Sequence, residues 1–226
     1  MDLLSEAHTA ERHARVALVE LGRRLESKGL IVAMDGNFSV RLPDDTLVVT
    51  PAGSPKGELQ PEDMVLTDLE GRPKSSGRPS SELAMHLGVY AVRHDVRAVV
   101  HAHPPAAIAH TIARVSLVEP LMPEAWVELG PVPTLPCVLP GTEAMRQQVM
   151  KPIMEHDVLM LERHGSLTVG SDLRSAYHRL EFLEQAAKVS LYARQIANGP
   201  VSPLPSAIRD KLSRKGPPDG GNGEAR

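Results

Sequence analysis

The sequence predicts a single α/β domain. Segments with strand-like and helix-like patterns alternate along the chain, and no Pro-, Gly- or Ser-rich linker divides its middle. The length of 226 residues fits one large domain, and 42% hydrophobic residues suffice for a substantial core. We expect this domain to span residues 1–205. Residues 206–226 are expected to be a flexible tail, because the chain ends in a Gly- and Pro-rich stretch without an apolar pattern.

The first half of the chain begins with a helix and continues with short strands. Residues 5–29 place Ala14, Leu18, Leu21 and Leu25 at alternating steps of four and three, which is helical spacing. Short strand-like segments follow over residues 36–42, 46–53 and 64–73. Residues 80–94 begin with serines suited to capping and carry apolar residues on one side, which indicates a helix.

The second half repeats the alternation of strands and helices. Buried strands are expected over residues 97–103 and 157–165. Helices are expected over residues 104–114, 142–156 and 172–199, the first with proline in its opening turn. The segment between residues 130 and 141 is too rich in proline to form a helix.

Charge and cysteine content exclude some classes of protein. The formal net charge is −3 and no basic run is present, so we expect no nucleic-acid partner. No apolar run reaches about 18 residues, so we expect no membrane span, and the first residues do not resemble a secretory leader. Cys137 is the only cysteine, which suggests a reducing compartment. These features predict a cytoplasmic location.

Two histidines near the end of a predicted strand are the first candidates for a functional site. Residues i and i+2 of a strand point to the same face, so His101 and His103 project together. Two imidazoles at this spacing can chelate one metal ion, although two histidines at a strand end, one of them bonded to a main-chain carbonyl, would show the same pattern. His164 ends another apolar strand and precedes a glycine. Three histidines with one position open are typical of a catalytic zinc site.

An acidic residue and two serines accompany the histidines. Ser80 and Ser81 lie at a predicted helix start, where free main-chain N–H groups can bind an anion. Glu82 falls in the first turn of that helix, where a carboxylate could act in catalysis or merely complement the helix dipole. Gly36 and Gly53 permit close main-chain approach to a phosphate, and Asn37 can donate hydrogen bonds to it. Taken alone, these loops are also compatible with ordinary turns.

The ordered motifs GNFS, TPAG, PSSE, VVHAH and ERHG together resemble the class II aldolase/adducin family over roughly residues 8–200. Within that family the chain is most similar to bacterial L-fuculose-1-phosphate aldolase-like enzymes. The resemblance implies a three-layer α/β/α sandwich around a mixed, largely antiparallel sheet. It also implies a homotetramer with active sites between subunits.

The resemblance further implies roles for the candidate residues. His101, His103 and His164 match the zinc ligands, with one divalent ion per subunit; manganese and cobalt stay open as alternatives. Glu82 matches a fourth ligand that also serves as the catalytic acid/base. The cradle for the phosphate of a small sugar substrate is implied at Gly36, Asn37, Gly53, Ser80 and Ser81. The implied reaction is aldol cleavage of a ketose 1-phosphate to dihydroxyacetone phosphate and a short aldehyde, through an enediolate.

Departures from the family pattern concern the substrate, and one of them is that Met34 and Asp35 displace the family's threonine just ahead of GN. The family's intersubunit tyrosine, which protonates the aldehyde, has no counterpart around Met122, and Ala52 replaces the phosphate-binding threonine of the TPxG loop. The same family contains pentulose-phosphate 4-epimerases, a thioribulose-phosphate dehydratase, acid-sugar phosphate decarboxylases and non-catalytic adducin-like domains. Epimerisation, decarboxylation and a purely binding role therefore stay open as alternatives to aldol cleavage.

Overall fold

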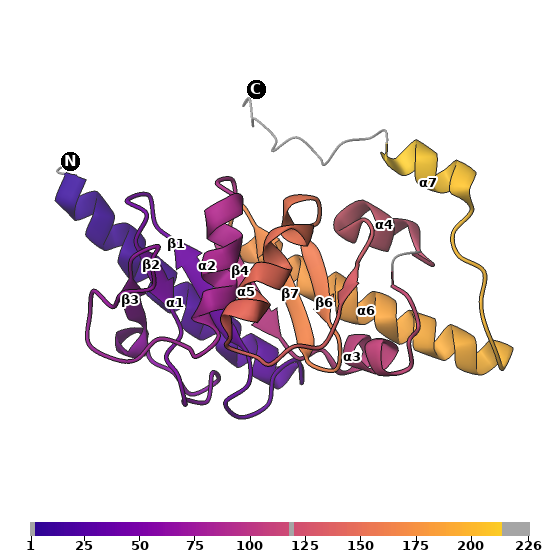
Figure 1. The fold of residues 1–226 in the computed structure, drawn as a ribbon, viewed down its shortest axis with the longest axis horizontal. Helices are drawn as coiled ribbons and strands as arrows, with labels where there is room; N and C mark the ends of the chain where they lie inside the picture. The colour runs from indigo at the N-terminus through magenta and orange to yellow at the C-terminus, as the bar shows by residue number, and fades with distance from the viewer. Residues whose placement is uncertain (1–2, 118–119, 214–226) are drawn as a thin grey trace, which may run out of the picture.

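The computed structural model describes residues 3–117 and 120–213, which alternate between helices and strands (Figure 1). The α-helices are α1 (Leu3–Ser27), α2 (Leu83–Val92), α3 (Pro105–Ile112), α4 (Pro123–Leu129), α5 (Glu143–Met150), α6 (Leu173–Ala197) and α7 (Ser206–Ser213). The strands are β1 (Asn37–Arg41), β2 (Leu47–Val49), β3 (Val65–Thr67), β4 (Ala98–Ala102), β5 (Thr134–Leu135), β6 (Val158–Leu161) and β7 (Gly165–Gly170). Short 3-10 helices lie at Pro61–Asp63 and Pro152–Met154.

The strands of the described residues form one mixed sheet in the order β3-β2-β1-β4-β7-β6-β5. Neighbouring strands are antiparallel except for the edge pair of β5 and β6, which is parallel. At the centre, β4 lies between β1 and β7, so that His101 pairs with Asn37 on one side and with Leu167 on the other. The candidate metal ligand His101 of β4 therefore lies in the middle of the sheet.

Helices cover both faces of the sheet (Figure 1). Successive residues of a strand point to opposite faces. Val100 accordingly packs in a core cluster with Leu18 of α1 and Leu180 of α6. Val99 packs on the other face with Leu87 of α2, in a cluster that also contains residues of α5. These three layers confirm the predicted fold class, and they place His101, two residues after Val99, on the face covered by α2.

The first part of the expected C-terminal tail is helical. The expected flexible tail was to begin at residue 206, but Ser206–Ser213 form helix α7, which lies against α4. Trp126 Nε1 of α4 donates a hydrogen bond of 3.1 Å to the main-chain oxygen of Arg209, and the Arg209 guanidinium lies 5.9 Å from the centroid of the Trp126 ring. These contacts fix α7 against α4. The helix is too short to be predicted from its own sequence pattern. Residues 214–226 lie outside the described residues.

Three further differences from the predicted elements matter for the site. Strand β7 and helix α4 were not predicted, and α2 begins at Leu83 rather than at the serines. Glu82 consequently occupies the position just before the helix and not its first turn.

No helix in the described residues combines the length and the apolar character that a membrane span requires.

Candidate functional site

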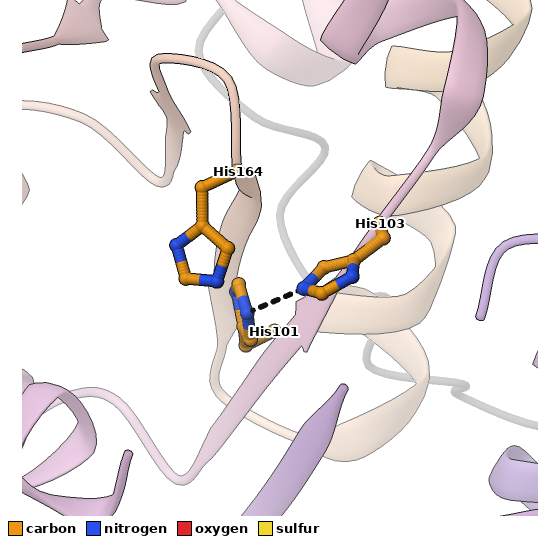
Figure 2. Close-up of side chains that lie close together, drawn as sticks. All are labelled: His101, His103 and His164. Atoms are coloured by element: carbon orange, nitrogen blue, oxygen red, sulfur yellow. Dashed lines mark hydrogen bonds between the residues drawn. The ribbon is translucent and has the colours of Figure 1, made fainter. Parts of the chain in front are cut away.

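The end of β4 presents two imidazoles toward α2. His101 is fully buried, and its main chain is paired on both sides within the sheet. His103 follows the strand directly and is only half-buried, and its main-chain N–H donates to the oxygen of Leu30 at 2.9 Å. The two rings lie next to each other, joined by a hydrogen-bond contact (Figure 2).

His164 reaches the same place from the turn between β6 and β7. Leu161 pairs with Gly165 across this turn, and Arg163 within it has a φ of 59°. A Cβ atom added at Gly165 would lie 2.5 Å from the main-chain oxygen of Ala102 and 2.9 Å from Cε1 of His101. Glycine is therefore required at position 165 if the hairpin is to lie this close to β4.

The three histidines each offer a nitrogen to a common point. One ring nitrogen of each lies within 4.8 Å of the corresponding nitrogen of the other two. The Nε2 atoms of His101 and His103 are 3.1 Å apart (Figure 2). His101 Nδ1 is 2.8 Å from the carbonyl oxygen of Ser166, and His103 Nδ1 is 3.1 Å from Oδ2 of Asp35. These acceptors require protons on both Nδ1 atoms, so in uncharged rings the two Nε2 lone pairs converge.

This convergence fits a divalent cation. Two lone pairs facing each other at hydrogen-bond distance repel unless a positive charge lies between them. A ligand imidazole usually donates its second N–H to a carboxylate or carbonyl, and Asp35 and Ser166 supply both kinds of partner. His164 Nδ1 and Glu82 Oε1 are buried without a hydrogen-bond partner among the described residues. Uncharged imidazoles and a carboxylate are the donor set that zinc, manganese and cobalt accept.

Glu82 bridges the histidines from the start of α2. Its Oε2 atom is 3.3 Å from Nε2 of His101, and its Oε1 atom is 3.3 Å from Nε2 of His164. Asn37 Nδ2 donates a hydrogen bond of 2.8 Å to Oε2. The side chain makes no capping bond to the helix. Its carboxylate is directed at the histidines.

The electrostatics of the site keep Glu82 ionised. Burial by itself would raise its pKa, but the hydrogen bond and charge of His101, the charge of His164 and the hydrogen bond from Asn37 lower it to about 2. The pKa of His164 is lowered to about 4, first by burial and then by the charge of His101. At neutral pH the site therefore combines an anionic carboxylate with an uncharged His164, which is the protonation state that metal ligation requires.

A pocket of about 250 Å³ lies above these groups. Its lining contains almost every residue predicted for the site, namely Gly36, Asn37, Gly53, Ser80, Ser81, Glu82, His103 and His164. His101 lies beneath it, fully buried. Thr50 accepts a main-chain hydrogen bond of 3.1 Å from Ser80, and Ala52 donates one of 3.0 Å to Arg78, so the two loops lie side by side. The structure thus brings the proposed phosphate loops to the edge of the histidine cluster.

A buried chain of hydrogen bonds behind Glu82 was not predicted. Asn37 donates through its Nδ2 atom, so its Oδ1 accepts from Nε2 of His86 at 2.6 Å. His86 Nδ1 then accepts from the Ser39 hydroxyl at 2.7 Å, and the Tyr90 hydroxyl lies 2.8 Å from the same oxygen. Burial lowers the pKa of His86 to about 3, with the charge of His101 as the next cause, so its ring is uncharged. The chain fixes the orientation of the Asn37 amide.

The sequence offers a partial indication of this hydrogen-bonded chain. His86 and Tyr90 follow Glu82 at four-residue steps, and residues four apart share one face of a helix. Sequence reasoning also missed Asp35, which orients His103, and Lys56, which lines the pocket.

The comparisons with known proteins agree with this geometry. Residues 16–191 match the family model described as the class II aldolase and adducin N-terminal domain, which is more than half of the chain. The chain belongs to the class II aldolase and adducin family. The resemblance read from the five motifs is thereby confirmed.

Relatives within the class II aldolase and adducin family carry out more than one reaction. The chain is 31% identical to a 3-oxo-tetronate 4-phosphate decarboxylase of Pectobacterium atrosepticum, covering 80% of this chain and 85% of that one. It is 35% identical to an L-fuculose phosphate aldolase of Methanococcus vannielii, covering 76% and 92%. A crystal structure of a putative aldolase/epimerase/decarboxylase from Klebsiella pneumoniae covers 90% of this chain and 99% of its own, with a TM-score of 0.83 and 28% identity.

These similarities bear on the class of activity. The named enzymes of the family act on phosphorylated sugars or sugar acids, and the three histidines of this chain form a group that could hold a metal ion. The family accordingly indicates an enzyme of sugar-phosphate metabolism, while the particular reaction differs among its members.

Proposed function

We propose that this protein is a zinc-dependent lyase that breaks a carbon–carbon bond next to the ketone of a phosphorylated sugar derivative. The observation that carries the proposal is the position of Glu82, whose carboxylate touches His101 and His164 at the floor of a pocket. A divalent ion held by the three histidines would polarise the ketone and offset negative charge developing on its oxygen. Glu82 would hold the proton that moves to or from the adjacent carbon.

Decarboxylation of a 3-oxo sugar-acid phosphate is the reaction we favour. In such a substrate the bond to the carboxylate breaks, carbon dioxide leaves, and the electron pair forms an enediolate that takes one proton at carbon. No proton has to be exchanged with the leaving group. Decarboxylation therefore needs no second proton donor such as a tyrosine, and the described residues that line the pocket include no tyrosine. The 31% identity to a decarboxylase over 185 residues supports the same choice.

Aldol cleavage of a ketose 1-phosphate is the second candidate. It breaks a bond to a carbon that carries a hydroxyl, whose proton must leave as the aldehyde forms, and it gives the same type of enediolate. The 35% identity to an L-fuculose phosphate aldolase favours this reaction. It requires a proton acceptor for the hydroxyl in addition to Glu82, and the segment around Met122 provides no tyrosine for that role.

The two candidates are separated by their products. Metal-loaded protein should be incubated with 3-oxo-tetronate 4-phosphate and, separately, with L-fuculose 1-phosphate. We expect carbon dioxide and dihydroxyacetone phosphate from the first substrate and little aldehyde from the second. Aldehyde release from the second substrate alone would favour the aldolase. Epimerised sugar phosphate would favour the epimerase alternative, and the absence of metal-dependent turnover on a wider panel would favour an adducin-like binding domain.

We also propose a homotetramer with active sites between subunits, as the family resemblance implies. Exposed apolar side chains on the C-terminal half of α6 support self-association, with Tyr192 57% and Ile196 87% exposed. Light scattering of the purified protein should give four times the chain mass of 24.5 kDa. A monomer at micromolar concentration would contradict this part of the proposal.

A further inference from the structure

Lys56 is a buried lysine whose ammonium lines the pocket beside the site. The residue is 2% exposed, and its Nζ donates to the main-chain oxygens of Ser54 at 2.7 Å and of Met34 at 3.1 Å. A lysine ammonium has three N–H groups. The third N–H group has no acceptor among the described residues, so it is left to donate to a group inside the pocket.

The charge of Lys56 has no direct counter-ion in the described part of the chain. Burial lowers its pKa, and the charges of the Asp35 and Glu82 carboxylates partly offset this at longer range. Neither carboxylate forms an ion pair with it within 4.0 Å. A buried charge is unfavourable unless it is paired. The two carboxylates are engaged with histidines, so the ammonium is free to pair with an anion that enters the pocket.

The loop that carries Lys56 is firmly placed. Helix α1 contacts its main chain so closely that a Cβ atom added at Gly22 would lie 2.1 Å from the oxygen of Lys56. The hydrogen bonds to Met34 and Ser54 join the loop before β1 to the loop after β2, and both loops line the pocket. The ammonium therefore needs no rearrangement in order to meet a ligand.

The chemistry of the lining indicates which anion. Among the described residues that line the pocket, Lys56 is the only lysine or arginine. Ala52, on the same loop, has no side-chain donor, whereas Ser80 and Ser81 supply hydroxyls from the facing loop. A dianion held only by hydroxyls and main-chain N–H groups, close to two carboxylates, would be repelled by Asp35 and Glu82. A charged donor at Lys56 offsets that repulsion.

We propose that Lys56 binds the phosphate group of the substrate and supplies the positive charge that the rest of the phosphate loops lack. This inference rests on the proposed function for the identity of the substrate. It adds to that function a binding residue, and it predicts selection for a phosphorylated over an unphosphorylated substrate.

Inorganic phosphate is the probe that tests the inference without relying on turnover. Calorimetric titration of metal-loaded protein should show phosphate binding, and Lys56→Gln should weaken it by at least about 10-fold. Gln can still donate to one of the two carbonyls but carries no charge. Lys28→Gln is the matched control, because Lys28 lies just after α1, is exposed and is paired with Glu181. It should bind phosphate as the wild type does.

Structural effects of the substitution can be separated from the loss of charge. Metal content and the circular dichroism spectrum should be unchanged in Lys56→Gln. If that variant does not fold, Lys56→Met replaces it. The unbranched methionine side chain can fill the space of the buried lysine stem without requiring hydrogen-bond partners. Lys56→Arg, which keeps the charge, should retain tighter phosphate binding than either neutral variant.

The results also distinguish this inference from the proposed function. If a sugar phosphate is turned over, Lys56→Gln should raise KM by about 10-fold or more with a smaller change in kcat. Phosphate binding that depends on Lys56 would support the inference even if no lyase activity were found. Equal phosphate affinity of wild type and a folded neutral variant, or no phosphate binding by the wild type, would overturn it.

Discussion

The Nε2 atoms of His101 and His103 face each other at 3.1 Å, while their Nδ1 atoms contact Ser166 and Asp35. With both Nδ1 protons committed to these acceptors, an uncharged ring has no proton on Nε2 to donate to the other. The sheet nevertheless holds the two rings in place, because His101 is paired on both sides and His103 is bonded to Leu30. The arrangement is therefore favourable when a positive charge lies between the rings, either a metal cation or a proton on one Nε2 atom.

The first prediction is that the protein contains about one divalent ion per chain, bound by this cluster. Replacing His101 or His164 by Ala should remove the ion, because two remaining imidazoles and a carboxylate bind zinc far more weakly than the full set. The measurement is metal analysis after dialysis. His94→Ala, which changes an exposed histidine outside the cluster, should keep its metal. Full metal content in a variant lacking His101, His103 and His164 would place the site elsewhere.

The second prediction concerns the residue that orients His103. Asp35→Asn removes the negative charge next to Nδ1 of His103, although the amide oxygen can still accept a hydrogen bond. Losing such an outer partner typically weakens metal affinity by about 10–100-fold, so we expect a loss in that range. Competition with a chromogenic chelator measures it. Asp45→Asn, on the exposed turn between β1 and β2, is the control, and equal losses in both variants would contradict the assignment.

The sequence was sufficient to predict the parts of the site that depend on local periodicity. His101 and His103 share a face because residues two apart in any strand do so. The position of Glu82 was predicted to within one residue, although a helix start cannot be located more closely from pattern alone. The alternation of helices and strands likewise predicted the α/β class.

The remaining parts depend on contacts between segments that are distant in the chain. His164 joins the other histidines because β7 pairs with β4, and the short, glycine-flanked segment of β7 carries little strand signal of its own. Asn37 lies 49 residues from His86, so nothing local indicates their hydrogen bond. The role of Lys56 depends on α1 packing against its main chain. Tertiary packing decides such features, and propensity does not.

The third prediction concerns the pH dependence of stability that His86 causes. The pKa of His86 is about 3 in the folded protein, against 6.5 for an ordinary histidine, chiefly because of burial. Between these values the unfolded chain binds a proton that the folded chain does not, so stability decreases as pH falls. From pH 7 to pH 5 this single group should lower the free energy of unfolding by roughly 2 kcal/mol.

Urea unfolding of the metal-free protein at both pH values tests the contribution of His86. The decrease in the free energy of unfolding from pH 7 to pH 5 should be smaller in His86→Gln than in the wild type by roughly 2 kcal/mol. His94→Gln, which changes an exposed histidine, should leave the decrease as it is in the wild type. An unchanged pH dependence in His86→Gln would show that the ring is not held uncharged within the fold.

The last prediction concerns the proton carried by Glu82. As a charge at a helix start, Glu82 would contribute about 0.3–1 kcal/mol to stability and nothing to turnover. Its carboxylate instead contacts His101 and His164, and a general acid or base in such a position typically contributes about 10²–10⁴-fold to the rate. Glu82→Gln keeps the shape and can retain the contact with Asn37, but it cannot carry a proton. We expect the variant to fold, to keep part of its metal, and to lose at least about 100-fold in turnover.

Hydrogen exchange into dihydroxyacetone phosphate isolates this step. The decarboxylase and the aldolase candidates share the enediolate of this product, so exchange of its carbon-bound proton with deuterated solvent does not depend on which reaction the protein catalyses. Mass spectrometry should show rapid deuterium incorporation with the wild type and at least about 100-fold slower incorporation with Glu82→Gln. Glu58→Gln, an exposed residue outside the pocket lining, is the control and should exchange at the wild-type rate. Exchange by Glu82→Gln at the wild-type rate, with metal retained, would mean that another group moves this proton and that Glu82 serves only to position the histidines.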